Sequence, residues 1–557
     1  MRLAYILMVL VLVCPVAAVN VAAIDNKRNG VVLQVEAEIV PGKGRVLIAS
    51  APFAGIDTQY SGRIAAEAAL NYTGQELGMR DIIYTFYANA TTVEGGSAGA
   101  AMALETIAKL QGRRIRDDII MTGGIGEDGK VLQVSGILEK LYPSKGYGLF
   151  IVPAGQLGVE AVAPFVREDD GKPVLVEEKV VIDIERYARQ HWGLEVVEVG
   201  TIGELAKIAF APEPYRPREA TKISLEPREI GKGEEPLASV AREFAEEARG
   251  IAAGMPEGED RQLIEDNIAS AEKYLGMGYP YSAANRAFKA LIDARTYGGE
   301  EFGTGELKER VRLKAEALEM PAGYSEPLPM LVAGRERYSW TLSEIWIQRL
   351  SGTEDAAGLE AADGWLDISA RFLDNVGGER VEFSSQLAHL AEMRLEEAKE
   401  EIAADFVLNQ DPYDSTHIAS AAEYDRRQGW YYEMGYDAIN AKARAFCIGD
   451  GKEMDEDAKR RVAEAEGYVS AAMEKGLGFW AEQYLGEAKI AFFENNTREA
   501  CAFGLMAKEY AEFDLEANGY VIEERARETV QVEKPLAVET QSFLRLIQNV
   551  LEFFGRQ

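Results

Sequence analysis

The chain has 557 residues, which exceeds one ordinary domain and predicts two to four. Its hydrophobic fraction of 47% permits a sizeable core and argues against a disordered chain. With 60 Lys and Arg against 92 Asp and Glu, the formal net charge is −32. This balance argues against nucleic acid and anionic lipid surfaces as binding partners, because both require a basic face.

The first residues have the layout of a secretory signal. A positive start at Met1-Arg2 is followed by a nearly continuous apolar run over residues 3–13. Two small-residue cleavage candidates follow, Val16–Ala18 and Val21–Ala23. We therefore predict a signal peptide over residues 1–23, with an uncleaved N-terminal anchor as the alternative. Either reading places the rest of the chain outside the cytoplasm, secreted or held at the cell surface, with any membrane association made through this segment.

Two cysteines remain beyond that segment, Cys447 and Cys501. An even pair in an oxidising compartment is typical of a disulfide. The alternative is a pair of buried thiols on separate helices. The sequence leaves both alternatives open.

Residues 28–213 predict an α+β domain. A helix is expected over residues 64–70 and another from Ser97, where apolar residues recur at three- and four-residue spacing. Turns are expected at Pro41–Gly44 and at Gly126–Gly129. The predicted strands are 31–40, 45–50, 82–87, 119–121, 131–134 and 149–152.

A proline- and charge-rich linker over residues 214–236 separates this domain from an Ala/Glu-rich helical region over 237–530. Two helical hairpins are expected there, 264–278 with 282–294 and 480–494 with 499–513. The segments Met277–Tyr279 and Met434–Tyr436 are each expected to precede a helix. The hairpins resemble tetratricopeptide-like units, without a fixed period.

The last segment, residues 537–557, predicts an amphipathic helix. Its apolar face is formed by Phe543, Ile547, Val550 and Phe554. It is too short to span a bilayer. We expect it to pack on the helical domain, with membrane or partner binding as the alternative.

The segment Glu94–Ala101 brings a serine, Ser97, to the start of a predicted helix behind two glycines. Glycines allow backbone N–H groups to converge on one point, where the helix dipole adds positive potential. These are the requirements of an oxyanion hole beside a nucleophile. The alternative is that Ser97 caps the helix, which is the commoner role for a serine in this position.

Lys140 follows 43 residues later, also at a predicted helix start after a glycine. Such a lysine is ordinarily solvated. To act as a base, its amine needs a pKa lowered from about 10.4 toward 7–8, which requires roughly 4 kcal/mol of desolvation or adverse charge. An apolar environment could come from its neighbours Val134, Ile137, Leu138 and Leu141.

Ser97 in Gly-Gly-Ser-Ala-Gly and Lys140 in Gly-Ile-Leu-Glu-Lys resemble the serine–lysine dyad motifs of the Lon family of peptidases, at the spacing that family uses. The resemblance covers residues 30–211. It implies an α+β Lon-type proteolytic domain, followed here by an all-α helical-hairpin domain. Other segments similar to the family lie in the same order: Val40–Gly44, Arg114–Asp118, Met121–Gly123 and Val131-Leu132.

The resemblance also implies a role for each residue. Ser97 would attack the scissile carbonyl, and Lys140 would take its proton and deliver it to the leaving amine. Thr122 would hydrogen-bond the dyad, and backbone N–H groups near Gly96 and Ser97 would bind the oxyanion. Glu94 matches an acidic residue of the family, with a gating or ordering role. Substrates would be proteins or peptides, and the family's ring-forming habit implies a homo-oligomer.

The chain departs from the family at several positions. Ile83 and Thr85 stand where bacterial members have histidines, and Gly124 stands where they have a glutamate. No ATPase module is recognisable. The nearest phosphate-loop candidate, Gly124–Val131, has no Ser or Thr after its lysine and continues into a strand, so we interpret it as a hairpin turn. The expected enzyme is therefore ATP-independent.

No cofactor or metal is expected, because His191, His389 and His417 are far apart and form no zinc motif. Two other functions remain as alternatives to an exported endopeptidase. One is a non-catalytic scaffold of the cell envelope with a degenerate Lon-like domain. The other is a domain that processes its own chain or a neighbouring one.

Overall fold

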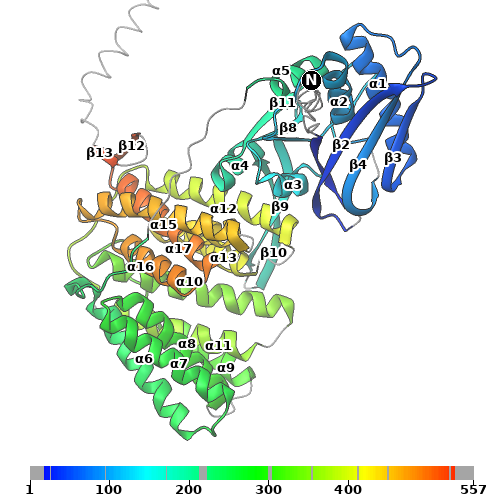
Figure 1. The fold of residues 1–557 in the computed structure, drawn as a ribbon. Helices are drawn as coiled ribbons and strands as arrows, with labels where there is room; N and C mark the ends of the chain where they lie inside the picture. The colour runs from blue at the N-terminus through cyan, green and yellow to red at the C-terminus, as the bar shows by residue number, and fades with distance from the viewer. Residues whose placement is uncertain are drawn as a thin grey trace, which may run out of the picture. The chain divides into compact units, whose positions relative to one another are not determined.

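A computed structural model describes residues 18–25, 27–93, 96–170, 172–212, 223–298, 304–352, 355–374, 376–409, 413–447, 451–525 and 529–533. The chain divides into two compact units (Figure 1). Unit 1 comprises residues up to 161 together with 179–219 and 406–410. Unit 2 comprises 162–178, 220–405 and the residues from 411 onward.

Unit 1 is built on a seven-stranded mixed sheet with the order β11-β8-β5-β1-β2-β4-β3. The neighbours β11, β8, β5 and β1 run parallel, whereas β2 is antiparallel to both β1 and β4, and β3 is parallel to β4. The strands are β1 (Val19–Ile24), β2 (Gly30–Pro41), β3 (Val46–Ala54), β4 (Arg80–Val93), β5 (Ile119–Met121), β8 (Leu149–Pro153) and β11 (Glu195–Val199).

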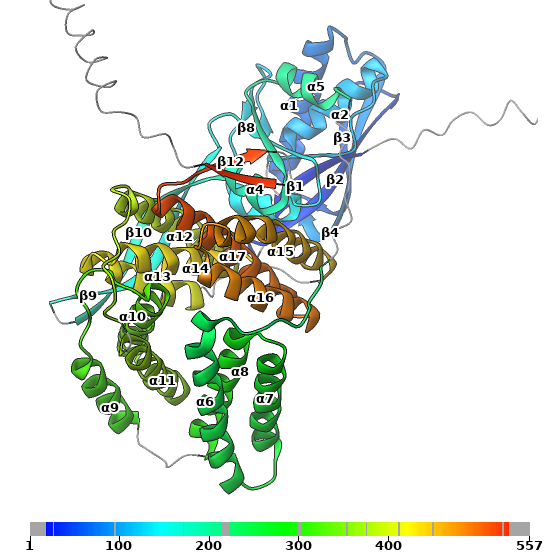
Figure 2. The ribbon, with the colours of Figure 1, turned by 90° about the vertical axis from the view of Figure 1, so that its left-hand side faces the viewer.

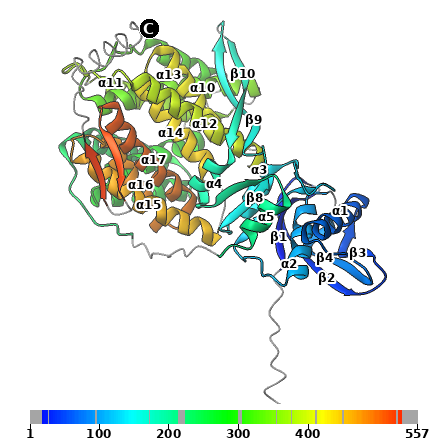
Figure 3. The same cartoon turned by 90° about the horizontal axis from the view of Figure 1, so that it is seen from above.

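Three helices complete the core of this unit: α1 (Ile56–Thr73), α2 (Gly99–Gln111) and α5 (Ile202–Ala209). Figure 3 shows α1 and α2 beside each other against the sheet. The middle of α2 is buried almost all round, because small alanines let the helix approach the strands closely. The remaining elements are β6 (Gly124–Ile125), β7 (Val131–Leu132), α3 (Ile137–Leu141) and α4 (Ile184–Trp192).

Strand β1 was not predicted, and it overlaps the end of the segment assigned to a signal or anchor, residues 1–23. Residues 19–24 form an inner strand between β5 and β2, and Val21 and Ala22 have no exposed surface. This nearly continuous run of small apolar residues was attributed to a signal or anchor, but it also suits a strand that is buried on both faces. Residues 1–17 lie outside the described part of the chain.

The strands predicted from 31 to 152 are confirmed, one of them, 119–121, with its predicted ends and the others with shifted ends. The turn at 126–129 joins β6 and β7 in an antiparallel hairpin, so the phosphate-loop candidate is a hairpin as expected. Helix α2 begins at Gly99 rather than Ser97. The long ribbon β9 (Gly158–Asp169) with β10 (Lys172–Asp183), and also α4 and β11, were not predicted.

The far end of the β9–β10 ribbon, residues 162–178, belongs to unit 2. The backbone N–H of Val166 donates to Ser420 Oγ at 2.8 Å. Lys399 Nζ lies 3.0 Å from a carboxylate oxygen of Glu178 and above the ring of Phe165. The domain predicted to end at residue 213 includes residues 162–178, which pack within unit 2. Sequence order alone does not reveal this packing.

Unit 2 is largely helical, with an alanine- and aromatic-rich core. The predicted hairpins are present as α7 with α8 and α16 with α17, whereas Met434–Tyr436 lies inside α14 and does not precede a helix. The helices are α6 (Glu235–Gly254), α7 (Glu259–Gly276), α8 (Pro280–Gly298), α9 (Thr304–Ala317), α10 (Leu328–Ser351), α11 (Ala356–Leu373), α12 (Leu387–Asn409), α13 (Tyr413–Gln428), α14 (Tyr431–Phe446), α15 (Gly451–Met473), α16 (Phe479–Phe493) and α17 (Thr497–Ala517).

A two-stranded ribbon, β12 (Val521–Arg525) with β13 (Thr529–Glu533), follows the last helix, in red in Figure 2. The amphipathic helix predicted for 537–557 lies outside the described residues. Within the described residues, no helix has both the length and the apolar character that crossing a membrane requires.

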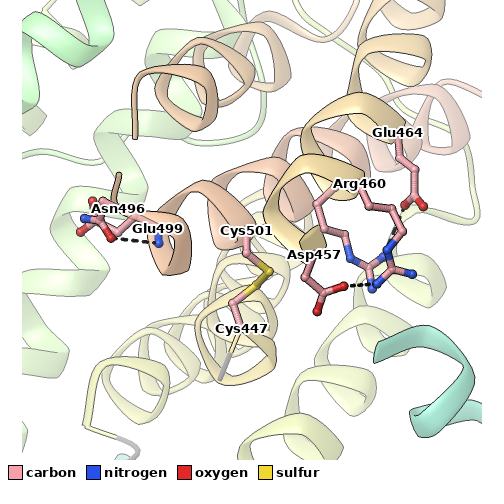
Figure 4. The surroundings of a disulfide bond; sticks show 8 residues. Cys447, Asp457, Arg460, Glu464, Asn496, Glu499 and Cys501 are labelled. Carbon is pink, nitrogen blue, oxygen red and sulfur yellow. Dashed lines mark hydrogen bonds and ion pairs between the residues drawn. A yellow bond between two sulfur atoms is a disulfide. The ribbon is translucent and has the colours of Figure 1, made fainter. Parts of the chain in front are cut away.

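Cys447, at the end of α14, and Cys501, in α17, form a disulfide with their Cα atoms 5.9 Å apart (Figure 4). This settles the two alternatives that the sequence left open. Both residues are buried, so the bond links two core helices across a sequence separation of 54.

Removing this bond is expected to lower the free energy of unfolding of unit 2 by about 4 kcal/mol, because the cross-link restricts the unfolded chain. Urea unfolding of the wild type with and without reductant, and of a Cys447→Ala/Cys501→Ala variant, measures the loss. The variant should match the reduced wild type and should not respond to reductant. Equal stability of the oxidised wild type and the variant would contradict the prediction.

Candidate active site

Ser97 lies in a turn directly before α2 and is half-buried. The N-cap residue of α2 is Ala98, and no side chain caps this helix. The commoner role of a serine at a helix start is therefore excluded. The Ser97 hydroxyl therefore does not cap α2. It lies at the N-terminus of this helix, where the backbone favours negative charge.

Two hydrogen-bond donors orient the peptide bond between Gly96 and Ser97 by binding its carbonyl oxygen. The Gly96 oxygen accepts from the Gly99 N–H at 3.0 Å and from Ser61 Oγ at 3.3 Å. In a trans peptide the N–H points opposite to the carbonyl. The Ser97 N–H is consequently directed away from α1 and α2, as a donor for an oxyanion must be.

The segment after β5 is joined to the serine loop by backbone hydrogen bonds. The Gly123 N–H donates to the Ser97 carbonyl at 2.8 Å, and the Ala100 N–H donates to the Gly123 carbonyl at 3.0 Å. Gly123 has φ of +154°, and a Cβ there would lie 2.9 Å from Val131 Cγ1. This position therefore requires glycine, and it brings Ser97 beside Thr122.

Thr122 is buried, and its backbone N–H donates to the Ile151 carbonyl at 3.0 Å. Within the described part of the chain, its Oγ1 has no hydrogen-bond partner. The expected hydrogen bond to the dyad is thus not formed in this structure. A buried hydroxyl without a partner costs about 1–3 kcal/mol.

Lys140 lies on the short helix α3 and is only 4% exposed. Gly136, which precedes α3, has φ of +69°, and a Cβ there would lie 2.0 Å from Ile24 Cδ1 at the end of β1. Because β1 runs parallel to β5, with Val21 opposite Met121, this contact places α3 near the end of β5 that leads into Thr122. The alternative of a solvated surface lysine is excluded.

Burial lowers the pKa of Lys140 to about 8, and the neighbouring Glu139 carboxylate opposes that shift. Arg28 forms an ion pair with Glu139 and holds this carboxylate. Of the four apolar neighbours expected to shield it, Ile137, Leu138 and Leu141 are buried and Val134 is half-buried. An amine with this pKa is partly uncharged near neutral pH and can accept a proton.

The structure thus joins Ser97 to Gly123, the residue after Thr122, and it places Lys140 at the same end of the sheet through β1 and β5. Gly96 is part of the serine loop, and Glu94 lies outside the described residues. The prediction missed Ser61 on α1, because no motif marks it and only the folded chain places it against Gly96. Within the described residues, no group of three His, Cys, Asp or Glu side chains could hold a metal ion.

Comparison with known proteins identifies this region. Residues 21–156 match the model of the Lon protease (S16) C-terminal proteolytic domain. These residues are similar to a Lon-type proteolytic domain. The match contains Gly96, Ser97, Thr122 and Lys140, and it begins inside β1.

Individual Lon proteases align over the same region. The chain is 35% identical over 137 residues to Lon protease 1 of Sorangium cellulosum, covering 23% of this chain and 17% of that protein. It is 31% identical over 137 residues to the archaeal Lon protease of Pyrococcus abyssi, covering 23% and 13%. It is 26% identical over 201 residues to the archaeal Lon protease of Archaeoglobus fulgidus, covering 34% and 27%. The chain thus spans less than a third of the length of these relatives.

Proposed function

We propose that this chain is an exported, ATP-independent serine endopeptidase whose Lon-type domain hydrolyses peptide bonds of proteins. The observation that carries the proposal is a lysine, Lys140, that is buried with a lowered pKa in a domain of this family. A buried lysine without such a use would be a net cost to folding. Ser97 is the nucleophile and Lys140 the general base.

The reaction has two stages. Lys140 Nζ takes the proton of Ser97 Oγ as this oxygen attacks the scissile carbonyl, and the oxyanion is stabilised by the Ser97 N–H. Lys140 then gives its proton to the leaving amine, so the C–N bond breaks and an ester on Ser97 remains. Water, deprotonated by Lys140, hydrolyses this ester and regenerates the serine hydroxyl.

Two features support the proposed ATP independence and the proposed export. The phosphate-loop candidate is a hairpin in which Lys130 Nζ pairs with Asp128 at 2.7 Å, which supports hydrolysis without ATP. The disulfide between Cys447 and Cys501 supports export, because such bonds persist in oxidising compartments. The tetratricopeptide-like hairpins of unit 2 are proposed to bind substrate or to mediate assembly into a homo-oligomer.

Digestion of an unfolded protein such as casein tests the proposal. The wild type should cleave internal peptide bonds at equal rates with and without ATP, with products mapped by mass spectrometry. Ser97→Ala protein prepared in parallel should give no products. A wild type that is folded but inactive under all conditions would favour the scaffold alternative, and strict ATP dependence would overturn the proposed independence.

Replacement of Ser61 by alanine is expected to lower kcat about 10-fold with little change in KM. The variant removes one of the two donors that orient the Gly96 carbonyl, and a well-placed oxyanion donor is worth 10²–10³ in kcat. A peptide boronate, which forms a tetrahedral adduct on serine, should bind more weakly by a similar factor.

Thr73→Ala is the matched control, because it removes a hydroxyl-to-carbonyl hydrogen bond from the same helix α1. It should lose stability without the change in kcat. Equal effects of the two variants on boronate affinity would show that Ser61 only supports the fold.

A further inference from the structure

Helix α2 carries a buried acidic side chain that the proposed reaction does not use. Glu105 is 1% exposed, and the backbone N–H groups of Ala37 and Val19 lie close enough to its carboxylate to lower its pKa. Its Oε1 has no hydrogen-bond partner among the described residues. The nearby Lys109 and Glu36 interact with each other, with Nζ and the carboxylate oxygen 3.7 Å apart.

A carboxylate in this position needs a cation. Burial raises the pKa of Glu105 to about 7, and the charge of Lys109 only partly opposes this. Acidic side chains are almost never fully buried unless they are paired. An orphaned buried oxygen lowers stability, and a donor at Oε1 would recover that loss.

The nitrogen of Val19 is the group best placed to become that cation. Val19 is the first residue of β1 and is 2% exposed, and its N–H already contacts the Glu105 carboxylate. The bond before it, Ala18–Val19, follows the small-residue pattern Val16–Ala18 of a signal cleavage site. The rival site after Ala23 would remove β1 from the middle of the sheet.

We propose that hydrolysis of the Ala18–Val19 bond by a signal-removing peptidase creates the mature N-terminus, and that the freed α-ammonium group of Val19 pairs with the buried carboxylate of Glu105. Water supplies the hydroxyl group that completes the Ala18 carboxylate and the hydrogen that completes the Val19 amine, which takes one further proton from solvent. The proposal rests on export, one part of the proposed function, and not on the Ser97–Lys140 dyad.

Cleavage changes the Val19 nitrogen from an amide with one donor to an ammonium group with three, which adds donors for Oε1. The positive charge also keeps the carboxylate ionised. Glu105 belongs to α2, the helix that follows the Ser97 loop. The ion pair would therefore link the start of β1 to the helix next to the nucleophile.

Four chains test the pairing: one beginning at Val19, one with a single glycine before Val19, and each of these with Glu105→Gln. They are made as fusions whose removal leaves no other residue. The Val19 chain should unfold about 5 °C above the glycine-extended chain, in the range expected for a gain of one to two kcal/mol. Glu105→Gln should abolish that difference. The same difference in both backgrounds, or none in the wild-type background, overturns the pairing.

A second measurement needs no substitution of Glu105. At neutral pH an amine-reactive ester should acylate the Val19 amine at least 10-fold more slowly than the glycine amine of the extended chain. Equal rates overturn the pairing. N-terminal sequencing after secretion of the full chain should begin at Val19, and a start at Ile24 or Met1 would overturn the cleavage site. Each result should be the same in Ser97→Ala protein, so failure of the dyad and failure of this inference are distinguishable.

Discussion

Replacing Lys140 with methionine is expected to reduce peptide hydrolysis by about 10²–10⁴-fold, the range for loss of a general base. Methionine fills a similar apolar volume but cannot take the proton of Ser97. Steady-state cleavage of a fluorogenic peptide measures the loss. In the wild type, kcat/KM should rise with pH through a pKa near 8, because only the uncharged amine is a base.

The same substitution is expected to stabilise unit 1. The Lys140 pKa falls from 10.5 to about 8 on folding, so below pH 8 the folded state holds a buried charge that the unfolded state exposes to water. The cost is about 3 kcal/mol at one pKa unit per 1.36 kcal/mol. The full cost applies below pH 8. It disappears as pH rises past 10.5, because the lysine is then uncharged in both the folded and the unfolded state. Thermal unfolding across this pH range should show the advantage of the variant shrinking.

Lys145→Met is the matched control, because Lys145 lies five residues further on and is half-buried. It should keep both the activity and the stability of the wild type. A Lys140→Met enzyme that is less stable than wild type at pH 7 would contradict the burial of a charged amine. One that keeps wild-type activity would contradict the assigned base.

The second large effect is expected for Ser97→Ala, which should lose at least 10³-fold in kcat while its dissociation constant for peptide stays within about threefold. The nucleophile is absent, but the groups that bind peptide are unchanged. Its melting temperature should equal that of the wild type, because Ser97 does not cap α2. Activity assays, peptide titration and calorimetry measure the three quantities.

Thr201→Ala provides the contrasting control. Thr201 does cap a helix, α5, within a full capping box. Its loss should cost about 1 kcal/mol of stability and leave hydrolysis intact. If Ser97→Ala instead resembled this variant, with lower stability and retained activity, Ser97 would be a structural residue.

Much of unit 1 could be predicted because its strands follow the expected alternation and its turns contain glycine. Strand β1 was missed because a buried inner strand and the end of a signal peptide share the same small apolar composition. The β9–β10 ribbon was missed because its contacts lie far away in sequence, as between Val166 and Ser420. Met434–Tyr436 was misread because a glycine inside α14 fits against Phe513, which only packing reveals.

Motifs in the sequence predicted Ser97 and Lys140 as candidate site residues. They did not predict the packing and hydrogen bonds that hold these residues. Burial of Lys140 depends on α3 packing against β1, the strand that the sequence failed to show. The orientation of the Ser97 N–H depends on Ser61, which lies 36 residues earlier and carries no signature of its own. Local spacing therefore indicated the candidate residues, whereas tertiary contacts determine how they are held.

The most direct test of the dyad is the rate at which a fluorophosphonate modifies Ser97, measured against pH. In the wild type this rate should rise through a pKa near 8, and Glu139→Gln should move the rise to lower pH, because the Glu139 charge raises that pKa. In Lys140→Met the rate should be at least 100-fold lower, without this rise. Modification of Ser97 in Lys140→Met at the wild-type rate and with the wild-type pH profile would contradict the account.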